Sequence, residues 1–441
     1  MKKLIGTVAV AALLASAAFA ELSISNWVRQ LWSPVKYNGG DVVTNSQNAW
    51  GTGRTAGVGF NWVGDDENAG ASFSFVVNPW DNGGMALDGN NIIWVKPWDF
   101  LKLTLGHWDG INDISTVNTA SWDWVRPNNW LGNLYAENEH TGAMIEIFPV
   151  DGLTVRVGLP FGDGDTLNGY LSYGMFEALH AEVEYTITDL LGIKLAWLGG
   201  GNRHTSLSPA FYWTDANGNV TTTNPRLPYK YDSSTFYNIG EIDVLLQLLA
   251  VENLQLDLGA RINLLNSSKL NDAYDAGLFD GFNPNPDKDG KQVFGGSIPT
   301  ALIGLKAGYA INDKFSVKAD FAVQTYKTVK DSAGDKFEQK PDFAFGVGVG
   351  VGLTDSLSLD ADFRVLLHGE AKDAGVKISS DYYNTDPTFS FLVGLNYACS
   401  TNAVVGIGFQ GKTNGGAIGD KISDRGDNFG FAVPIKVEVS F

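Results

Sequence analysis

Apolar and polar residues alternate along many stretches of this 441-residue chain. From Leu101 to Leu105 and from Leu153 to Val157, every odd position is aliphatic and every even position is polar or charged. Longer stripes of the same kind run over residues 254–264, 315–324 and 357–365. A period of two predicts a β-strand with one apolar face and one wetted face. The pattern therefore predicts an all-β fold.

Short segments with turn chemistry separate pairs of these stripes. They are rich in Asp, Asn, Gly and Pro, which favour tight turns, and they predict eight hairpins, at residues 65–68, 97–99, 149–152, 188–189, 251–253, 312–313, 354–355 and 400–402. Nine longer polar segments lie between the hairpins, at residues 33–54, 79–90, 107–140, 160–178, 200–236, 266–298, 328–341, 369–387 and 412–428. With an opening strand at 22–31 and a closing strand at 429–441, about eighteen strands are expected, an even number as in bacterial barrels.

The length of the stripes favours a membrane over water. A strand of roughly 9 to 11 residues crosses a bilayer when tilted. Aromatic residues mark many stripe ends, either as a membrane-interface girdle or through plain β propensity, namely Trp62, Trp94, Tyr185, Trp197, Tyr309, Tyr397 and Phe441. The sequence predicts a transmembrane antiparallel up-and-down β-barrel with short periplasmic turns and long extracellular loops. The count falls to sixteen if Asn91–Lys96 and Lys102–Gly106 belong to loops.

The first residues have the layout of an export signal. Lys2 and Lys3 precede an apolar run at residues 4–14 and a small-residue end at Ala18-Phe19-Ala20. This order of charge, apolar core and cleavage-like site predicts that residues 1–20 form a cleaved signal peptide. Residues 21–441 are then expected to form one domain, since no linker or low-complexity tract interrupts them.

Composition narrows the function classes. The formal net charge is −18 and there is one cysteine. So acidic a chain argues against a nucleic-acid partner. A Gly-x-Ser-x-Gly elbow is absent and the five histidines are scattered, so we expect no enzyme, cofactor or metal site.

The last strand carries a family resemblance. Ile435-Lys436-Val437-Glu438-Val439-Ser440-Phe441 alternates to a final aromatic residue. With the signal peptide, it resembles the terminal strand of bacterial outer-membrane barrels of the general and sugar porin classes. The resemblance implies an outer-membrane location, contact with lipids, recognition by the barrel-insertion machinery through Phe441, and a homotrimer.

Barrel width suggests a function. Porins of 16 to 18 strands leave an aqueous channel, so we expect passive diffusion of small hydrophilic solutes. An adhesin or structural protein without channel activity is the alternative. If the aliphatic stripes face lipid, the opposite positions line the lumen with nearly balanced charges and a modest cation preference, among them Lys102, Arg156, Glu182, Glu184, Asp257, Arg261, Lys318, Asp320, Asp360, Asp362 and Arg364.

The third long segment, residues 107–140, is the candidate constriction. In general and sugar porins the third loop folds into the barrel, and the resemblance in loop order and length implies the same here. Tryptophans beside hydrogen-bonding charges suit sugar rings, although the rings could equally pack the loop itself. The residues concerned are Trp108, Asp109, Trp122, Asp123, Trp124, Arg126 and Trp130.

One further stripe is unusual. Between Phe343 and Leu353 the polar face is reduced to Gly346, Gly348, Gly350 and Gly352. This face is expected to leave room for a plug or an inward loop.

Overall fold

The computed structural model describes residues 20–37, 42–46, 56–77, 85–87, 90–108, 140–160, 179–199, 211–214, 220–221, 238–268, 270–271, 293–294, 299–373, 375–377, 387–412 and 429–440. The predicted signal peptide, apart from Ala20, and the final Phe441 lie outside these residues. Within them, no helix is long and apolar enough to cross a membrane.

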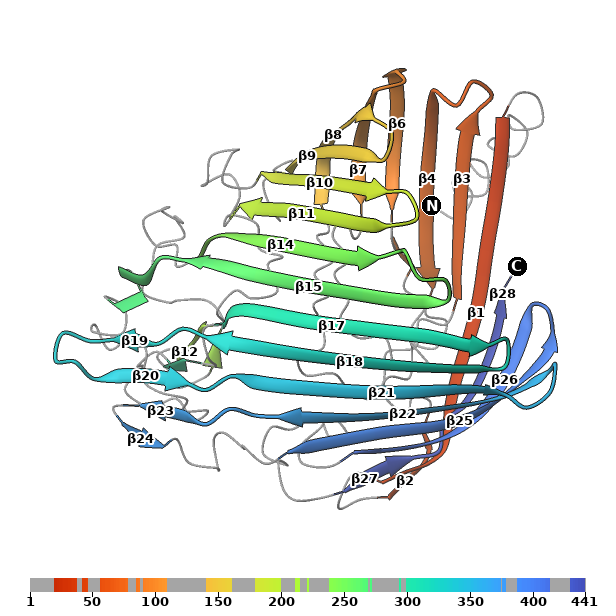
Figure 1. Cartoon of the computed structure of the whole chain (residues 1–441). Coiled ribbons are helices and arrows are strands. Elements are labelled where there is room, and N and C mark those ends of the chain that lie inside the picture. The colour runs from red at the N-terminus through yellow and green to blue at the C-terminus, as the bar shows by residue number, and fades with distance from the viewer. Residues whose placement is uncertain are drawn as a thin grey trace.

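A single antiparallel sheet forms the wall of a barrel (Figure 1). Its long strands are β1 (Ala20–Tyr37), β3 (Ala56–Gly64), β4 (Ala69–Val77), β6 (Asn91–Trp98), β7 (Leu101–Trp108), β8 (His140–Val150), β9 (Leu153–Pro160), β10 (His180–Ile187), β11 (Leu191–Gly199), β14 (Asn238–Leu248), β15 (Leu254–Leu265), β17 (Pro299–Asn312), β18 (Phe315–Tyr326), β21 (Asp342–Gly352), β22 (Leu357–Leu367), β25 (Thr388–Ser400), β26 (Ala403–Lys412) and β28 (Ile435–Ser440).

These strands pair in chain order, and the first pairs with the last. Trp27 on β1 lies opposite Ser440 on β28, and the register continues to Trp32 opposite Ile435. The ring is therefore closed, as predicted for an up-and-down barrel. Each of the long strands described above therefore has a paired neighbour on both sides, which removes the exposed edges of an open sheet.

The strand count differs from the expectation. The sheet contains 21 strand segments, more than the predicted eighteen. The additional short segments are β2 (Val42–Ser46), β5 (Met85–Leu87) and β27 (Gly430–Ala432). Each shares a partner with a longer strand: β2 and β3 both pair with β1, β5 and β6 with β4, and β27 and β28 with β26.

Proline explains one of these interruptions. Pro434 separates β27 from β28 and has no N–H to give to the ladder. The sixteen-strand alternative is wrong, because the segments around Asn91 and Lys102 form the paired strands β6 and β7. The prediction of a long loop from residue 33 is also wrong, because β1 continues to Tyr37 and pairs there with β2.

All eight predicted short turns join strands that pair as hairpins. Local chemistry stabilises them. In the β3–β4 turn, the backbone N–H of Asn68 donates to the Asp66 carboxylate at 3.1 Å and lowers the pKa of that carboxyl. In the β8–β9 turn, Gly152 has a φ of 77°, which glycine adopts without strain.

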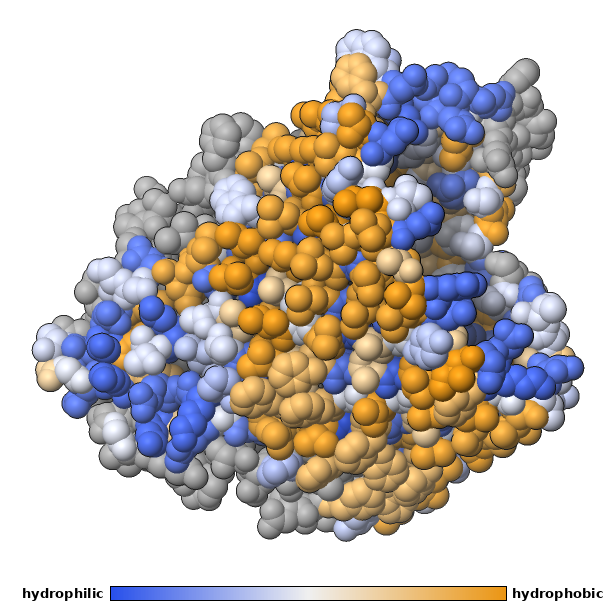
Figure 2. All heavy atoms as spheres, viewed as in Figure 1, coloured by the Kyte–Doolittle hydropathy of each residue, from blue (hydrophilic) through white to orange (hydrophobic). Residues whose placement is uncertain are grey.

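The two faces of the wall differ in chemistry. On β21, Phe345 and Val347 are 45% and 54% exposed, and they alternate with glycines on the other face. On β10, the buried Glu182 and the exposed Val183 alternate in the same way. Figure 2 shows an apolar belt across the middle of the strands, with polar regions at both ends. A belt of this kind is what hydrocarbon contact requires.

Exposed aromatic rings lie on this outer face near the short turns. Tyr185, Tyr309 and Tyr397 are 39%, 44% and 52% exposed. Trp98 and Phe100, at the β6–β7 turn, stack at 5.8 Å between ring centroids. Trp94 differs, because it packs over Gly70 on the inner face, and its assignment to the outer girdle is wrong.

Two small sheets are separate from the sheet that forms the wall. One contains β19 (Val329–Lys330), β20 (Lys336–Gln339), β23 (Ala371–Asp373) and β24 (Val376–Lys377), and the other contains β12 (Phe211–Thr214), β13 (Val220–Thr221) and β16 (Val293–Phe294). The first lies at the rim opposite the short turns (Figure 1). Val329 and Phe337 are buried in it, at 0% and 3% exposure, so it has a small core of its own.

Candidate functional site

Ionisable side chains lie on the inner, less exposed face of the barrel wall. The strand alternation places them there, because each is flanked along its strand by outward apolar residues. They fall into three groups, described in turn below.

The first group is a row of alternating charge across β7, β8, β9, β10 and β11. Lys102 lies opposite Glu146, and Glu146 lies opposite Arg156. The Lys102 Nζ lies 2.7 Å from a Glu146 oxygen. The Arg156 guanidinium contacts Glu146 at 3.1 Å, Glu182 at 2.5 Å and Glu184 at 2.8 Å. One arginine thus contacts three carboxylates.

The row ends at Lys194, whose Nζ is 4.0 Å from both Glu182 and Glu184. The His180 Nε2 lies 3.6 Å from Glu182, and both side chains are fully buried. Strand register explains the whole arrangement, because residues directly opposite on neighbouring strands place their side chains on the same face.

The second group is the most buried. Arg261 on β15 is 0% exposed and donates twice to Asp243, at 3.0 and 2.9 Å. It also lies 2.9 Å from Glu241. Nearby, Gln255 donates to Asp257 at 2.8 Å and the Lys306 Nζ lies 3.8 Å from the same carboxylate. The two parallel hydrogen bonds from Arg261 to Asp243 are of the kind that a planar guanidinium forms with a carboxylate.

The third group spans the glycine stripe of β21. Gly346 lies between Asp320 on β18 and Arg364 on β22 in the register. The Arg364 guanidinium reaches across it to Asp320 at 3.2 Å. A Cβ at Gly346 would lie 2.7 Å from both Asp320 carboxylate oxygens. The glycine therefore permits an ion pair between strands that are not neighbours.

Two parallel rows follow toward the short turns. Gly348 lies between Lys318 and Asp362, and Gly350 lies between Ser316 and Asp360. The expectation that the stripe leaves free room is wrong at Gly346, where Asp320 occupies the space. At Gly350 the Ser316 hydroxyl would likewise lie 2.8 Å from a Cβ.

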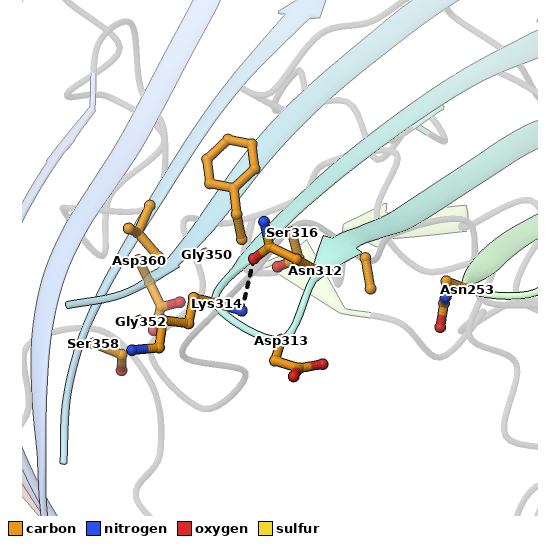
Figure 3. A pocket seen from close by; sticks show the side chains of 12 residues that line it. Asn253, Asn312, Asp313, Lys314, Ser316, Gly350, Gly352, Ser358 and Asp360 are labelled. Carbon is orange, nitrogen blue, oxygen red and sulfur yellow. Dashed lines mark hydrogen bonds between the residues drawn. The ribbon is translucent and has the colours of Figure 1, made fainter. Parts of the chain in front are cut away.

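A recess of about 410 Å³ opens at the short-turn rim, next to Gly350 and Gly352 (Figure 3). Its lining combines hydroxyls, amides and charges from the ends of β17, β18, β21 and β22. Asp360 is partly exposed there and accepts a hydrogen bond from the Asn396 side chain at 2.6 Å. The sequence pattern did not predict this recess, because the recess depends on which turns meet in space.

The predicted constriction can be compared only in part. Asp109, Trp122, Asp123, Trp124, Arg126 and Trp130 lie outside the described residues. The backbone of Trp108 belongs to the wall rather than to the loop, since it ends β7 and pairs with His140.

Two inner tryptophans were not predicted as such. Trp27 packs over Gly57 and lies 4.5 Å from the Arg29 guanidinium. Trp94 packs over Gly70 and lies 5.5 Å from the Lys102 Nζ. Each ring packs over a glycine of the neighbouring strand. Tryptophans at polar-face positions near such glycines are the sequence signal that could have revealed them.

No family model matches this chain, and no curated protein matches it. It is similar to several solved structures. The outer membrane channel DcaP of Acinetobacter baumannii is 10% identical with a TM-score of 0.46, over 96% of this chain and 98% of that one.

In-vitro folded OmpT, an outer membrane protein of Vibrio cholerae, is 13% identical with a TM-score of 0.46, over 96% and 98% of the chains. The anion-selective porin from Comamonas acidovorans is 11% identical with a TM-score of 0.42, over 96% and 100%. Porins are thus among the similar structures, as the sequence resemblance implied.

Proposed function

We propose that this chain is an outer-membrane channel for passive diffusion of small hydrophilic solutes. The observation that carries the proposal is the closed wall with an apolar outer face and an ionisable inner face. Charged side chains such as Lys102, Arg156 and Asp257 would be costly to bury in an apolar core, whereas water and ions in a lumen would solvate them. Barrels this wide leave an aqueous interior.

The same proposal assigns the lumen wall. Lys102, Arg156, Glu182, Glu184, Asp257, Arg261, Lys318, Asp320, Asp360, Asp362 and Arg364 lie on the inner face and would line the lumen. Their ion pairs reduce the net field that a permeating ion meets, which supports only a modest cation preference. Outer-membrane lipids would cover the opposite face. The insertion machinery would read the strand that ends at Phe441, and three copies would assemble.

The test is a recording of single-channel conductance from refolded protein in planar bilayers. We expect stepwise openings and a potassium-to-chloride permeability ratio modestly above one. A barrel that shows heat modifiability in gel electrophoresis, and so is folded, but never conducts would overturn the proposal.

That outcome would favour the second candidate, a surface adhesin. One observation supports it: the four-stranded sheet of β19, β20, β23 and β24 extends beyond the wall with its own buried side chains, Val329, Phe337 and Ala371. Such a sheet could present a rigid surface to a partner. Binding of the folded barrel to host or bacterial surfaces, lost on deletion of residues 331–335, would identify it.

Sugar preference is a finer proposal. It depends on the tryptophans of segment 107–140. The residues named above as the candidate constriction are proposed to contact the sugar. Titration of oligosaccharide into a conducting bilayer tests it. Conductance that stays constant up to millimolar sugar would contradict it without affecting the channel proposal.

A further inference from the structure

The recess beside Gly350 and Gly352 contains the Asp360 carboxylate. No cationic residue lies directly across from Asp360 in the register of β18, β21 and β22. In the first glycine row Asp320 faces Arg364, and in the second Lys318 faces Asp362. In the third row the partner across Gly350 is Ser316, a hydroxyl, and Asp360 faces it. A Cβ at Gly350 would lie 2.8 Å from the Ser316 Oγ and 3.5 Å from an Asp360 oxygen.

The Ser316 hydroxyl and the Asp360 carboxylate therefore lie over this glycine, at the edge of the recess. Asp360 forms no salt bridge with any cation in the described part of the chain. Lys318 and Lys436 attract it only at longer range. The other oxygen-bearing side chains of the lining are Ser358, Asn253, Asn312 and Asp313. Lys314 also lines the recess, and its side chain runs from the turn toward Ser358 (Figure 3).

We propose that this recess is a subsite for a small cationic solute, an alkali cation or the ammonium group of an amine, held by Asp360 with the hydroxyls of Ser316 and Ser358. The proposal deepens the channel function and rests on it: the subsite would hold the cation at the short-turn mouth of the lumen. Its place at the rim keeps the carboxylate hydrated, so binding is weak enough for release.

A divalent metal centre fits less well. Among the described residues, no group of three His, Cys, Asp or Glu side chains converges to hold a metal ion. The lining has two carboxylates, Asp360 and Asp313, together with hydroxyl and amide oxygens, whereas a tight calcium site gathers about six to eight oxygen ligands around one point.

The test measures access and local potential without requiring conduction. Ser358→Cys changes one side-chain atom inside the recess, and Cys399→Ser removes the native exposed thiol. The rate at which the thiol reacts is measured on the folded protein in detergent with two methanethiosulfonate reagents. One carries a cationic trimethylammonium group and the other an anionic sulfonate group. We expect the cationic reagent to react faster. Adding Asp360→Asn should lower the cationic-to-anionic rate ratio about tenfold at low salt, for a charge roughly 5 Å away in water.

The matched control is Ser390→Cys, on the inner face of β25 and 4% exposed, which should react slowly with both reagents. Ser316→Cys provides a second probe if Ser358→Cys does not fold. A recess thiol that does not react, or a rate ratio that Asp360→Asn leaves unchanged, overturns the subsite. Failure of the wild-type protein to conduct overturns the channel function instead, so the two failures are distinguishable.

Discussion

At the scale of single residues, Arg156 supplies the positive charge at the centre of the row of charged residues on β7–β11. It contacts Glu146, Glu182 and Glu184. Arg156→Gln should leave these carboxylates less compensated and raise the potassium-to-chloride permeability ratio, because the lumen loses one positive charge. Reversal potentials in a salt gradient measure this. Arg156→Lys, which keeps the charge, should stay near wild type, and an unchanged ratio in the glutamine variant would remove Arg156 from the permeation path.

Gly346 is the second residue with a specific role. Gly346→Val should displace the Asp320 carboxylate from Arg364 and lower the free energy of unfolding by about 1–3 kcal/mol. Urea unfolding of the refolded barrel measures the effect. If the clash with Asp320 is the cause, Asp320→Ala combined with Gly346→Val should cost less than the sum of the single variants. Strictly additive losses would refute that explanation.

At the scale of elements, the turns set the hairpin geometry. Gly152 has a positive φ, and a Cβ there would lie 2.4 Å from the Thr186 carbonyl oxygen. Gly334, in the turn between β19 and β20, also has a positive φ but nothing within 4 Å. Gly152→Ala should therefore destabilise the barrel by about 1–3 kcal/mol, and more than Gly334→Ala does. Equal losses in urea unfolding would mean that backbone strain alone, and not the Thr186 contact, matters.

At the scale of the whole molecule, Figure 2 shows an apolar belt on the outer face of the wall, which the proposed function assigns to contact with lipid. Val347 is 54% exposed on the outer face, so Val347→Lys should cost roughly 2–4 kcal/mol in lipid vesicles near the bilayer midplane. Gln255→Lys, on the inner face near the rim, should cost much less because water solvates it. Similar losses for both would contradict the assignment of faces.

The sequence predicted some features because they are local. Alternation with period two locates strands such as those around Leu101 and Leu153 without knowledge of the partner, since side chains on a strand must point to opposite sides. Turn residues such as Asp66 and Gly152 act within a few positions of the chain. The eight hairpins follow from these two rules together.

Other features needed the register between distant strands. Tertiary structure brought Asp320 and Arg364 together across Gly346, and turned Trp94 inward over Gly70, because neighbours in space are set by the pairing of strands. It also assembled the Asp360 recess from the β17–β18 and β21–β22 hairpins and from Asn253 in the β14–β15 turn. The sequence by itself thus determined a barrel wall with an apolar and an ionisable face. Only the closed sheet decided which of the described charges form ion pairs and that Asp360 lines a recess instead, since ion pairing depends on distances that alternation does not fix.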